Sequence, residues 1–229
     1  MTSTQALPSV NNTFGKTVKP ISVPKRHLFG PGPSNANPLV LEALALQPVG
    51  HLDPYYIDLM AEVQDLLRYS WQTTNRLTLP MSGTGSAAME ATLANIVEPG
   101  DTVLVGIKGY FGNRLFDMAG RYKANVQTIK TDWGKAFSLE QIENALKEHN
   151  PSVFALVHAE TSTGVCQPME GIGELCRKYN CLLILDTVTS LGGVPLFIDE
   201  WKVDLAYSCS QKGLSCPPGL GPFTMNKRA

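Results

Sequence analysis

The sequence Ser208-Cys209-Ser210-Gln211-Lys212-Gly213-Leu214 places one lysine among small and hydroxyl-bearing residues, directly after the apolar run Leu205–Tyr207. The stretch offers Lys212 neither an opposite charge nor a long apolar face for its stem, which a surface lysine would normally use. A lysine held in a confined site can attack a carbonyl and form a Schiff base. Taken alone, the stretch leaves two interpretations open: a reactive lysine, or an ordinary loop lysine after a strand.

A second signal lies upstream, where the apolar run Cys181–Leu185 ends at Asp186. Such a run, after the basic stretch Arg177-Lys178, is typical of a buried parallel strand that follows a helix. A carboxylate at the carboxyl end of this strand lies where open α/β sheets bind ligands, and its burial requires a cationic or hydrogen-bonding partner. A strand that ends at an aspartate, followed along the chain by a strand that leads into a lysine, is the layout of a pyridoxal phosphate site. In such a site the acid holds the pyridinium and the lysine holds the aldehyde.

Hydrophobic periodicity predicts strands that alternate with helices along most of the chain. The expected helices are 38–46, 56–69, 87–97, 116–122, 138–149 and 172–179. The expected strands are 77–81, 102–106, 125–129, 152–157, 181–185, 204–207 and 221–225. This alternation predicts an α/β fold with three layers, in which helices cover both faces of a mostly parallel sheet. Residues 1–27 lack sustained periodicity and are expected to form a mobile amino-terminal arm, which leaves 28–229 as the folded domain.

The composition is typical of a globular protein and gives no reason to expect nucleic-acid or membrane partners. The 229 residues include 43% hydrophobic and 17% charged side chains, as in a soluble globular protein with a real core. A net charge of −1 gives no electrostatic reason to expect nucleic-acid or anionic-membrane partners. No apolar stretch approaches the roughly 20 residues that span a bilayer, and the amino terminus lacks a secretory pattern. We therefore expect a cytoplasmic protein.

The cysteines and histidines give no sign of a metal site. The five cysteines are odd in number and none forms a C-x-x-C pair, while the four histidines are scattered. We expect free thiols in a reducing compartment rather than disulfides or zinc.

The segment Ser82-Gly-Thr-Gly-Ser86 lies between the expected strand 77–81 and the expected helix 87–97. Its glycines let the backbone approach an anion, and the free amides at the helix start, with the Thr84 and Ser86 hydroxyls, would bind phosphate. A dinucleotide fingerprint and a plain helix-capping turn remain alternatives for this segment alone. The dinucleotide alternative lacks an acidic residue at the end of a second strand about 20 residues on.

Two more strand exits carry groups that suit a flat, polar ligand. Gly109-Tyr-Phe-Gly112 follows 102–106, and its aromatic residues can either stack on a ring or pack into the core. The hydroxyl-rich stretch His158–Gly164 follows 152–157. Carboxyl ends of parallel strands meet at one edge of a sheet, so both exits are expected near Asp186.

As a set, these segments resemble the fold-type I, pyridoxal-phosphate-dependent aminotransferases of class V, and within them most closely the alanine–glyoxylate or serine–pyruvate group. Each segment is weak alone, but together they are specific and extend from about residue 28 to the end of the chain. They are Gly30-Pro-Gly-Pro-Ser34, Ser82-Gly-Thr-Gly-Ser86, Glu98-Pro-Gly-Asp101, Glu160-Thr-Ser-Thr-Gly164, Asp186-Thr-Val-Thr-Ser-Leu-Gly-Gly193 and Ser208-Cys-Ser-Gln-Lys-Gly213.

The resemblance implies roles around the cofactor ring. Lys212 would hold the aldehyde as a Schiff base and, once freed, would move the proton between the substrate α-carbon and the cofactor. Asp186 would keep the ring nitrogen protonated. Val188 and Phe111 would pack on the two faces of the ring, where many members carry tryptophan in place of Phe111. Thr161 would lie near the phenolic oxygen of the ring, where serine is common.

The resemblance also implies phosphate, substrate and partner contacts. The phosphate would be held by Thr84, Gly85, Ser86 and Gln211. Gly50 and His51 match a loop near the substrate. Members of the family form homodimers with sites at the interface, so a homodimer is expected here.

The implied reaction is transfer of an amino group between alanine or serine and glyoxylate or pyruvate. The alternatives within class V are a phosphoserine or 2-aminoethylphosphonate aminotransferase and a cysteine desulfurase. A desulfurase needs a mobile catalytic cysteine, and Cys209 and Cys216 lie too close to Lys212 in the sequence to suit that role. Members of the family have a longer large domain and then a small carboxy-terminal domain, so we expect a chain truncated at its carboxyl end. The arginine that binds the substrate carboxylate, and any carboxy-terminal targeting signal, would lie in the absent part. A non-catalytic fragment that binds pyridoxal phosphate is the remaining alternative.

Overall fold

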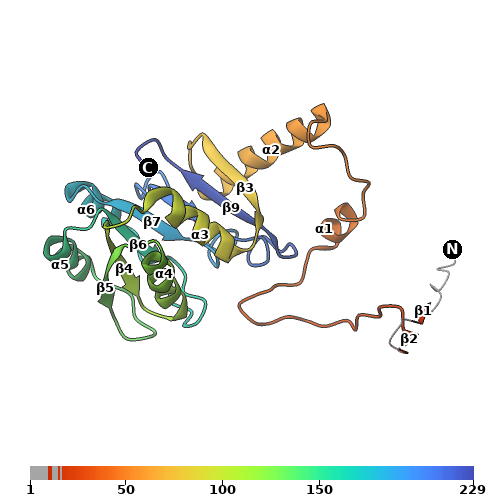
Figure 1. Ribbon diagram of the computed structural model, residues 1–229, viewed down its shortest axis with the longest axis horizontal. Coiled ribbons are helices and arrows are strands. Elements are labelled where there is room, and N and C mark those ends of the chain that lie inside the picture. Colours follow the sequence, from red (N-terminus) through yellow and green to blue (C-terminus); the bar gives the residue numbers. More distant parts are fainter. Residues whose placement is uncertain (1–9, 12–14, 16) are drawn as a thin grey trace.

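A seven-stranded sheet forms the centre of the protein in a computed structural model that describes residues 10, 11, 15 and 17–229 (Figure 1). The strand order is β3-β9-β8-β7-β6-β4-β5. The strands are β3 (Leu77–Gly83), β4 (Thr102–Ile107), β5 (Asn125–Lys130), β6 (Val153–Val157), β7 (Leu182–Asp186), β8 (Leu205–Tyr207) and β9 (Gly219–Met225). Only β9 pairs antiparallel with its neighbours, so the other strands point one way and their carboxyl ends meet at one edge. The expected, mostly parallel sheet is confirmed.

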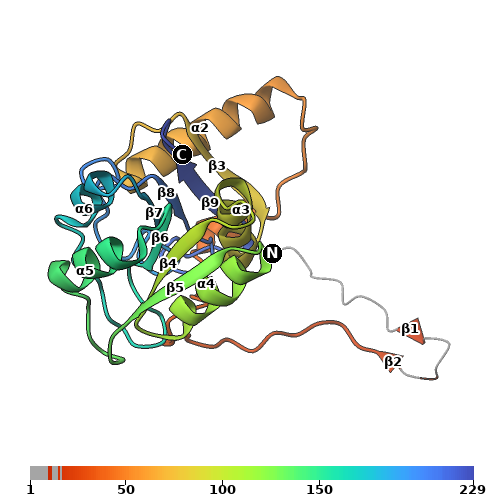
Figure 2. The same cartoon turned by 60° about the vertical axis from the view of Figure 1, so that its left-hand side comes forward.

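Helices cover both faces of this sheet. The helices of the described chain are α1 (Pro38–Ala43), α2 (Pro54–Trp71), α3 (Gly85–Ile96), α4 (Tyr110–Arg121), α5 (Leu139–His149) and α6 (Ile172–Lys178), of which α1 buries no side chain and does not cover the sheet. Figure 2 shows the helices α2 to α6 around the sheet. α3 and α4 contribute to one buried apolar cluster, whereas the carboxyl end of α2, α5 and α6 contribute to the other. The two clusters on opposite faces give the expected three-layer α/β fold.

β6 shows why a continuous apolar run was the right signal. All five of its residues are buried. Phe154 and Leu156 join the cluster on the α5 side, and Val153, Ala155 and Val157 join the cluster on the α3 side. A strand covered on both faces must be apolar at every position rather than at alternate ones.

Local signals set the start of α5 as predicted. The Ser138 hydroxyl accepts from the Gln141 amide at 3.2 Å, and the Gln141 side chain accepts from the Ser138 amide at 2.9 Å. These reciprocal bonds form a capping box.

Two helices differ from the sequence-based expectation. α4 begins at Tyr110 rather than at residue 116, because the buried Glu160 carboxylate accepts from the amides of Phe111 and Gly112 at 3.2 and 3.3 Å. This cap comes from a residue distant in sequence, so local periodicity does not reveal it. α1 ends at Ala43 rather than at residue 46, and it buries no side chain that would extend it.

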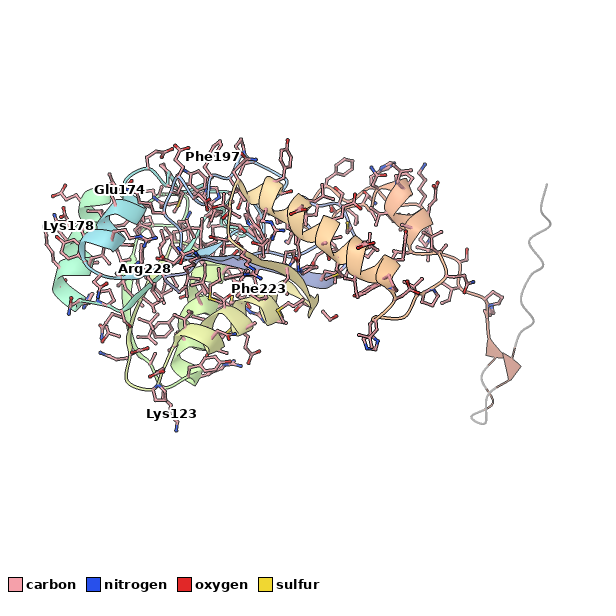
Figure 3. All side chains as sticks on the ribbon, turned by 90° about the horizontal axis from the view of Figure 1, so that it is seen from above. Lys123, Glu174, Lys178, Phe197, Phe223 and Arg228 are labelled. Atoms are coloured by element: carbon pink, nitrogen blue, oxygen red, sulfur yellow. The ribbon has the colours of Figure 1, made fainter. Side chains whose placement is uncertain are left out.

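α2 connects the sheet to the amino-terminal segment. Of its residues only Leu67 and Trp71 are buried, both at the carboxyl end, and the helix reaches beyond the sheet toward α1 (Figure 3). The Trp71 indole donates to the Thr187 hydroxyl at 3.0 Å, which attaches this end of α2 to the chain that leaves β7.

The predicted arm, residues 1–27, lies partly outside the described residues, which exclude 1–9, 12–14 and 16. Within it, β1 (Val10–Asn11) and β2 (Thr17–Val18) pair antiparallel as a separate small sheet. Residues 19–30 are exposed, and Figure 1 shows this segment extending away from the central sheet. Its mobility stays a prediction.

No helix in the described part of the chain has the length and apolar character to cross a membrane. No cluster of metal-ligating side chains occurs among the same residues. All the cysteines are free thiols.

Gly173, in the first turn of α6, marks a close contact between a helix and the loop before β8. A Cβ atom at this position would lie 2.0 Å from the Trp201 carbonyl oxygen and 2.8 Å from the Lys202 Cβ. By contrast, a Cβ atom at Gly120, inside α4, would meet no atom within 4 Å.

We predict that Gly173→Ala lowers the free energy of unfolding by roughly 1–3 kcal/mol, because the backbone must shift to relieve the overlap. The matched variant Gly120→Ala should raise it by roughly 0.5–1 kcal/mol, since alanine favours an exposed helical position. Urea unfolding followed by circular dichroism measures both changes. Equal stability of the two variants would contradict the contact at Gly173.

Candidate active site

The carboxyl ends of the parallel strands surround one cavity of about 170 Å³. Its lining brings together most of the site residues predicted from the sequence, which come from loops far apart along the chain. The lining residues are Thr84, Gly85, Ser86, Met89, Phe111, Asp186, Val188, Cys209, Gln211 and Lys212.

The amino terminus of α3 forms one wall of this cavity. Its first turn leaves backbone amides without intrahelical partners, and the helix dipole adds a partial positive charge. Thr84 is the N-cap residue, but its side chain makes no capping hydrogen bond, so the hydroxyl is not used by the helix. A Cβ atom at Gly85 would lie 3.1 Å from Cys209 Cβ and 3.3 Å from Val188 Cγ2, so glycine permits this tight approach. The wall suits a phosphate group.

Gln211 presents a polar atom that the protein does not satisfy. Its side-chain oxygen is buried without a hydrogen-bond partner. Because the oxygen and nitrogen of an amide can exchange places by a flip, the same position can offer an N–H donor. A phosphate oxygen in the cavity would therefore fit both Gln211 and the α3 amides.

Asp186 is the last residue of β7, and it is buried in the lining of the cavity. Its Oδ2 accepts from the Tyr207 hydroxyl at 2.7 Å, and its Oδ1 accepts from the Val188 amide at 2.8 Å. Burial raises the pKa of this carboxyl to about 6, and the two hydrogen bonds oppose the rise. Asp186 is thus an anion at neutral pH that would gain from a cationic partner such as a protonated ring nitrogen.

Tyr207 is a residue that the sequence analysis missed as part of the site. It ends β8 directly beside Asp186 in the parallel register, and it is fully buried. The usable signal was its position at the last residue of a strand adjacent to the strand that ends at Asp186.

Lys212 lies in the loop after β8, and the amino-terminal segment holds this loop in place. The Lys212 Nζ donates to the Pro31 carbonyl at 2.6 Å. The Ser34 amide donates to the Gln211 carbonyl at 2.9 Å, and the Ser34 hydroxyl donates to the Lys212 carbonyl at 2.8 Å. The proline- and glycine-rich entry at 30–34 therefore supports the lysine loop, a contact that spans most of the chain.

Phe111 reaches the cavity from the first turn of α4, whose start depends on Glu160. The Glu160 carboxylate also accepts from the Ser162 hydroxyl at 2.7 Å. Glu160 thereby connects the loop after β6 to the helix that carries Phe111. The sequence analysis included Glu160 in a matching segment but gave it no role.

Three predicted site residues do not line the cavity. Thr161 follows β6 at the same edge of the sheet, where its hydroxyl pairs with the hydroxyl of Thr189. Gly50 and His51 are exposed in the loop before α2. Their roles near the ring oxygen and the substrate stay predictions.

A larger cavity of about 630 Å³ lies at the opposite ends of β3 and β9. Its ionisable side chains are Arg76 and Lys227, and no carboxylate, thiol or imidazole lines it. The smaller cavity is the better candidate for catalysis, because it combines a buried acid, an amine and free helix amides.

Comparisons with known proteins agree with this geometry. The family model of the class-V aminotransferases matches residues 28–229. The alanine–glyoxylate aminotransferase of Drosophila melanogaster is 47% identical over 212 residues, which cover 92% of this chain and 54% of that protein. The (S)-ureidoglycine–glyoxylate transaminase of Bacillus subtilis is 42% identical over 208 residues, which cover 91% of this chain and 50% of that protein.

A solved structure gives the same result. The crystal structure of alanine–glyoxylate aminotransferase from Nostoc sp. superposes with a TM-score of 0.93 at 63% sequence identity, covering 96% of this chain and 59% of that chain. This chain spans about half the length of the curated relatives that it matches. With the family model matched over residues 28–229 and the fold in agreement over 96% of the chain, the chain belongs to the class-V aminotransferase family.

Proposed function

We propose that the full-length protein is a pyridoxal-phosphate-dependent aminotransferase that transfers an amino group between alanine or serine and glyoxylate or pyruvate. The observation that carries the proposal is the single cavity shared by buried Asp186, Lys212 and the amino terminus of α3. The relatives named for glyoxylate transamination support the choice of acceptor.

The residues of the cavity fit pyridoxal phosphate. The α3 amides, with Thr84, Ser86 and Gln211, would hold the phosphate, and Asp186 would hold the proton on the ring nitrogen. Val188 and Phe111 would confine the ring. When bound, the cofactor supplies an electron sink for the charge that develops at the substrate α-carbon.

Lys212 is the only amine among the residues that line the cavity. It is therefore the candidate for both the covalent attachment and the proton transfer at the substrate α-carbon. Its hydrogen bond to the Pro31 carbonyl holds the amine at the edge of the cavity. The amine must exchange this bond for the reacting groups before it can move a proton.

The alternative activities are less well supported. A cysteine desulfurase needs a reactive, mobile thiol, whereas Cys209 is buried in the wall of the cavity and burial raises the pKa of its thiol. The relatives at 42–47% identity carry names of glyoxylate transaminases, which favours glyoxylate over phosphoserine or 2-aminoethylphosphonate as a substrate. A non-catalytic fragment remains an interpretation of the 229 residues by themselves.

We further propose that 28–229 is part of a large cofactor-binding domain, that 1–27 is an arm, and that the protein is cytoplasmic. A homodimer is proposed because the amino-terminal segment exposes many large apolar side chains that the rest of the described chain does not cover. They include Ile21, Val23, Phe29, Leu39, Leu44, Leu46 and Leu52. Surfaces of this kind mark interfaces.

The cofactor proposal predicts a specific covalent product. After incubation with pyridoxal phosphate and reduction with borohydride, intact mass and peptide mapping of the full-length protein should show one pyridoxyl group on Lys212. Lys212→Arg should remove it, whereas the exposed control Lys178→Arg should retain it. A folded, full-length protein without the adduct would exclude the pyridoxal phosphate site.

The reaction itself is tested by amino transfer with alanine or serine as donor and glyoxylate or pyruvate as acceptor. We expect turnover with at least one pair. Asp186→Asn should reduce kcat by about 10²- to 5 × 10³-fold, because removal of one partner of a buried ion pair costs about 3–5 kcal/mol. The control Asp132→Asn, whose carboxylate is exposed, should keep full activity. Absence of amino transfer with all four pairs would refute the proposed substrates.

The assembly is tested by sedimentation equilibrium of the full-length protein. We expect twice the mass of one chain. Replacing the exposed Phe29 and Leu39 by serine should shift the equilibrium toward the monomer, since their burial contributes roughly 1.5–3 kcal/mol each. A monomer at micromolar concentration in the unmodified protein would contradict the homodimer.

A further inference from the structure

Asp186 and Tyr207 are paired by the sheet itself. β7 and β8 run parallel with Asp186 opposite Tyr207, so both side chains project from the same face. The Tyr207 ring is fully buried in the apolar cluster that includes Ala88 and Met89 of α3. From this position its hydroxyl donates to Asp186 Oδ2 at 2.7 Å.

The two hydrogen bonds leave Asp186 able to accept one more. A carboxylate offers about four lone-pair sites, two on each oxygen. The Val188 amide uses one site on Oδ1, and the Tyr207 hydroxyl uses one site on Oδ2. The carboxylate is therefore held at both oxygens and still has free lone pairs for a donor in the cavity.

The charged groups around Asp186 determine how much its ionised form depends on the hydrogen bond from Tyr207. Burial and the nearby Glu160 carboxylate raise the pKa of Asp186, whereas Lys212 lowers it. Lys108 is also near, but its buried ammonium donates to the carbonyls of His158 and Val165 at 3.0 and 3.3 Å. No ion pair forms between Asp186 and a cationic side chain within the described residues. The Tyr207 hydroxyl is thus the side-chain donor that supports the ionised form.

We propose that Tyr207 is a positioning residue for the reaction proposed above: its hydroxyl fixes the Asp186 carboxylate as an anion directed at the ring nitrogen of the cofactor. Tyr207 acts through Asp186 and touches neither substrate nor cofactor. This inference depends on the proposed function, because the ring nitrogen belongs to the cofactor.

The direction of the pH effect follows from the hydrogen bond. In Tyr207→Phe the ionised carboxylate loses a donor, so the pKa of Asp186 rises further above its raised value of about 6. As the pH falls through this pKa, Asp186 takes up a proton and no longer stabilises a protonated ring nitrogen. The variant should therefore lose activity at a higher pH than the unmodified protein.

The test uses Tyr207→Phe in the full-length protein loaded with pyridoxal phosphate. Phenylalanine keeps the buried ring and removes only the hydroxyl. We expect kcat to fall by roughly 10- to 100-fold, since hydrogen bonds to charged groups are worth about 1.5–3 kcal/mol. The acid limb of the pH profile should move up by about one pH unit.

A matched control is Tyr179→Phe. The Tyr179 hydroxyl also donates to a carboxylate, that of Glu143 at 2.9 Å, but Tyr179 is the C-cap residue of α6, directly after Lys178, which Figure 3 labels. This variant loses the same chemical group far from the cavity. It should keep the kcat and the pH profile of the unmodified protein.

The affinity for the cofactor distinguishes a positioning role of Tyr207 from a general contribution of Tyr207 to the stability of the fold. Tyr207→Phe should weaken binding of pyridoxal phosphate by about tenfold. It should leave binding of the analogue whose ring nitrogen is replaced by carbon unchanged, because that analogue cannot hold a proton for Asp186. Equal weakening for both compounds would mean a structural role and would overturn the proposal.

The outcomes also separate this inference from the proposed function. If the unmodified protein forms the Lys212 adduct but Tyr207→Phe changes neither the pH profile nor the relative affinities, Tyr207 has no positioning role and the cofactor site stands. If the unmodified protein forms no adduct, both proposals are overturned.

Discussion

The burial of one carboxylate, that of Asp186, constrains the architecture around it. A buried anion needs donors, and the sheet provides them from the adjacent strand β8 and from the turn that follows β7. With the donors in place, burial still keeps the pKa at about 6, so the site favours a further positive partner. Because the Asp186 carboxylate favours a positive partner, the cavity suits a ligand with a protonated ring.

The rest of the cavity depends on contacts between distant segments. Segment 30–34 holds the lysine loop, Glu160 starts the helix that carries Phe111, and Trp71 of α2 binds the chain beyond β7. Each contact joins a loop at one edge of the sheet to a segment far away in the sequence. The strands fix where each loop begins. These contacts can therefore hold an acid, an amine and an anion-binding helix terminus around one small cavity.

Much of the fold and site was predictable because the signals were local. Apolar runs identified the buried strands, capping residues identified α5, and polar residues at strand ends identified Asp186 and the Ser82–Ser86 turn. The predictions that failed or were incomplete concern elements whose limits depend on distant partners. α4 begins early because Glu160 caps it, and α1 stops early because nothing covers it. Gly50 and His51 are exposed and do not line the cavity, and their role near the substrate stays a prediction.

By itself, the amino-acid sequence determined the α/β class, the mostly parallel arrangement of the strands and the residue types of the site. These features depend on hydrophobic periodicity and on the residues at strand ends, which are local properties of the sequence. Only the tertiary structure decided which of those residues meet and which partners they use. The pairing of Tyr207 with Asp186 is the clearest example, since it requires β7 and β8 to be neighbours in register. Register arises from packing of the whole sheet between its helices, and no local stretch of sequence specifies it.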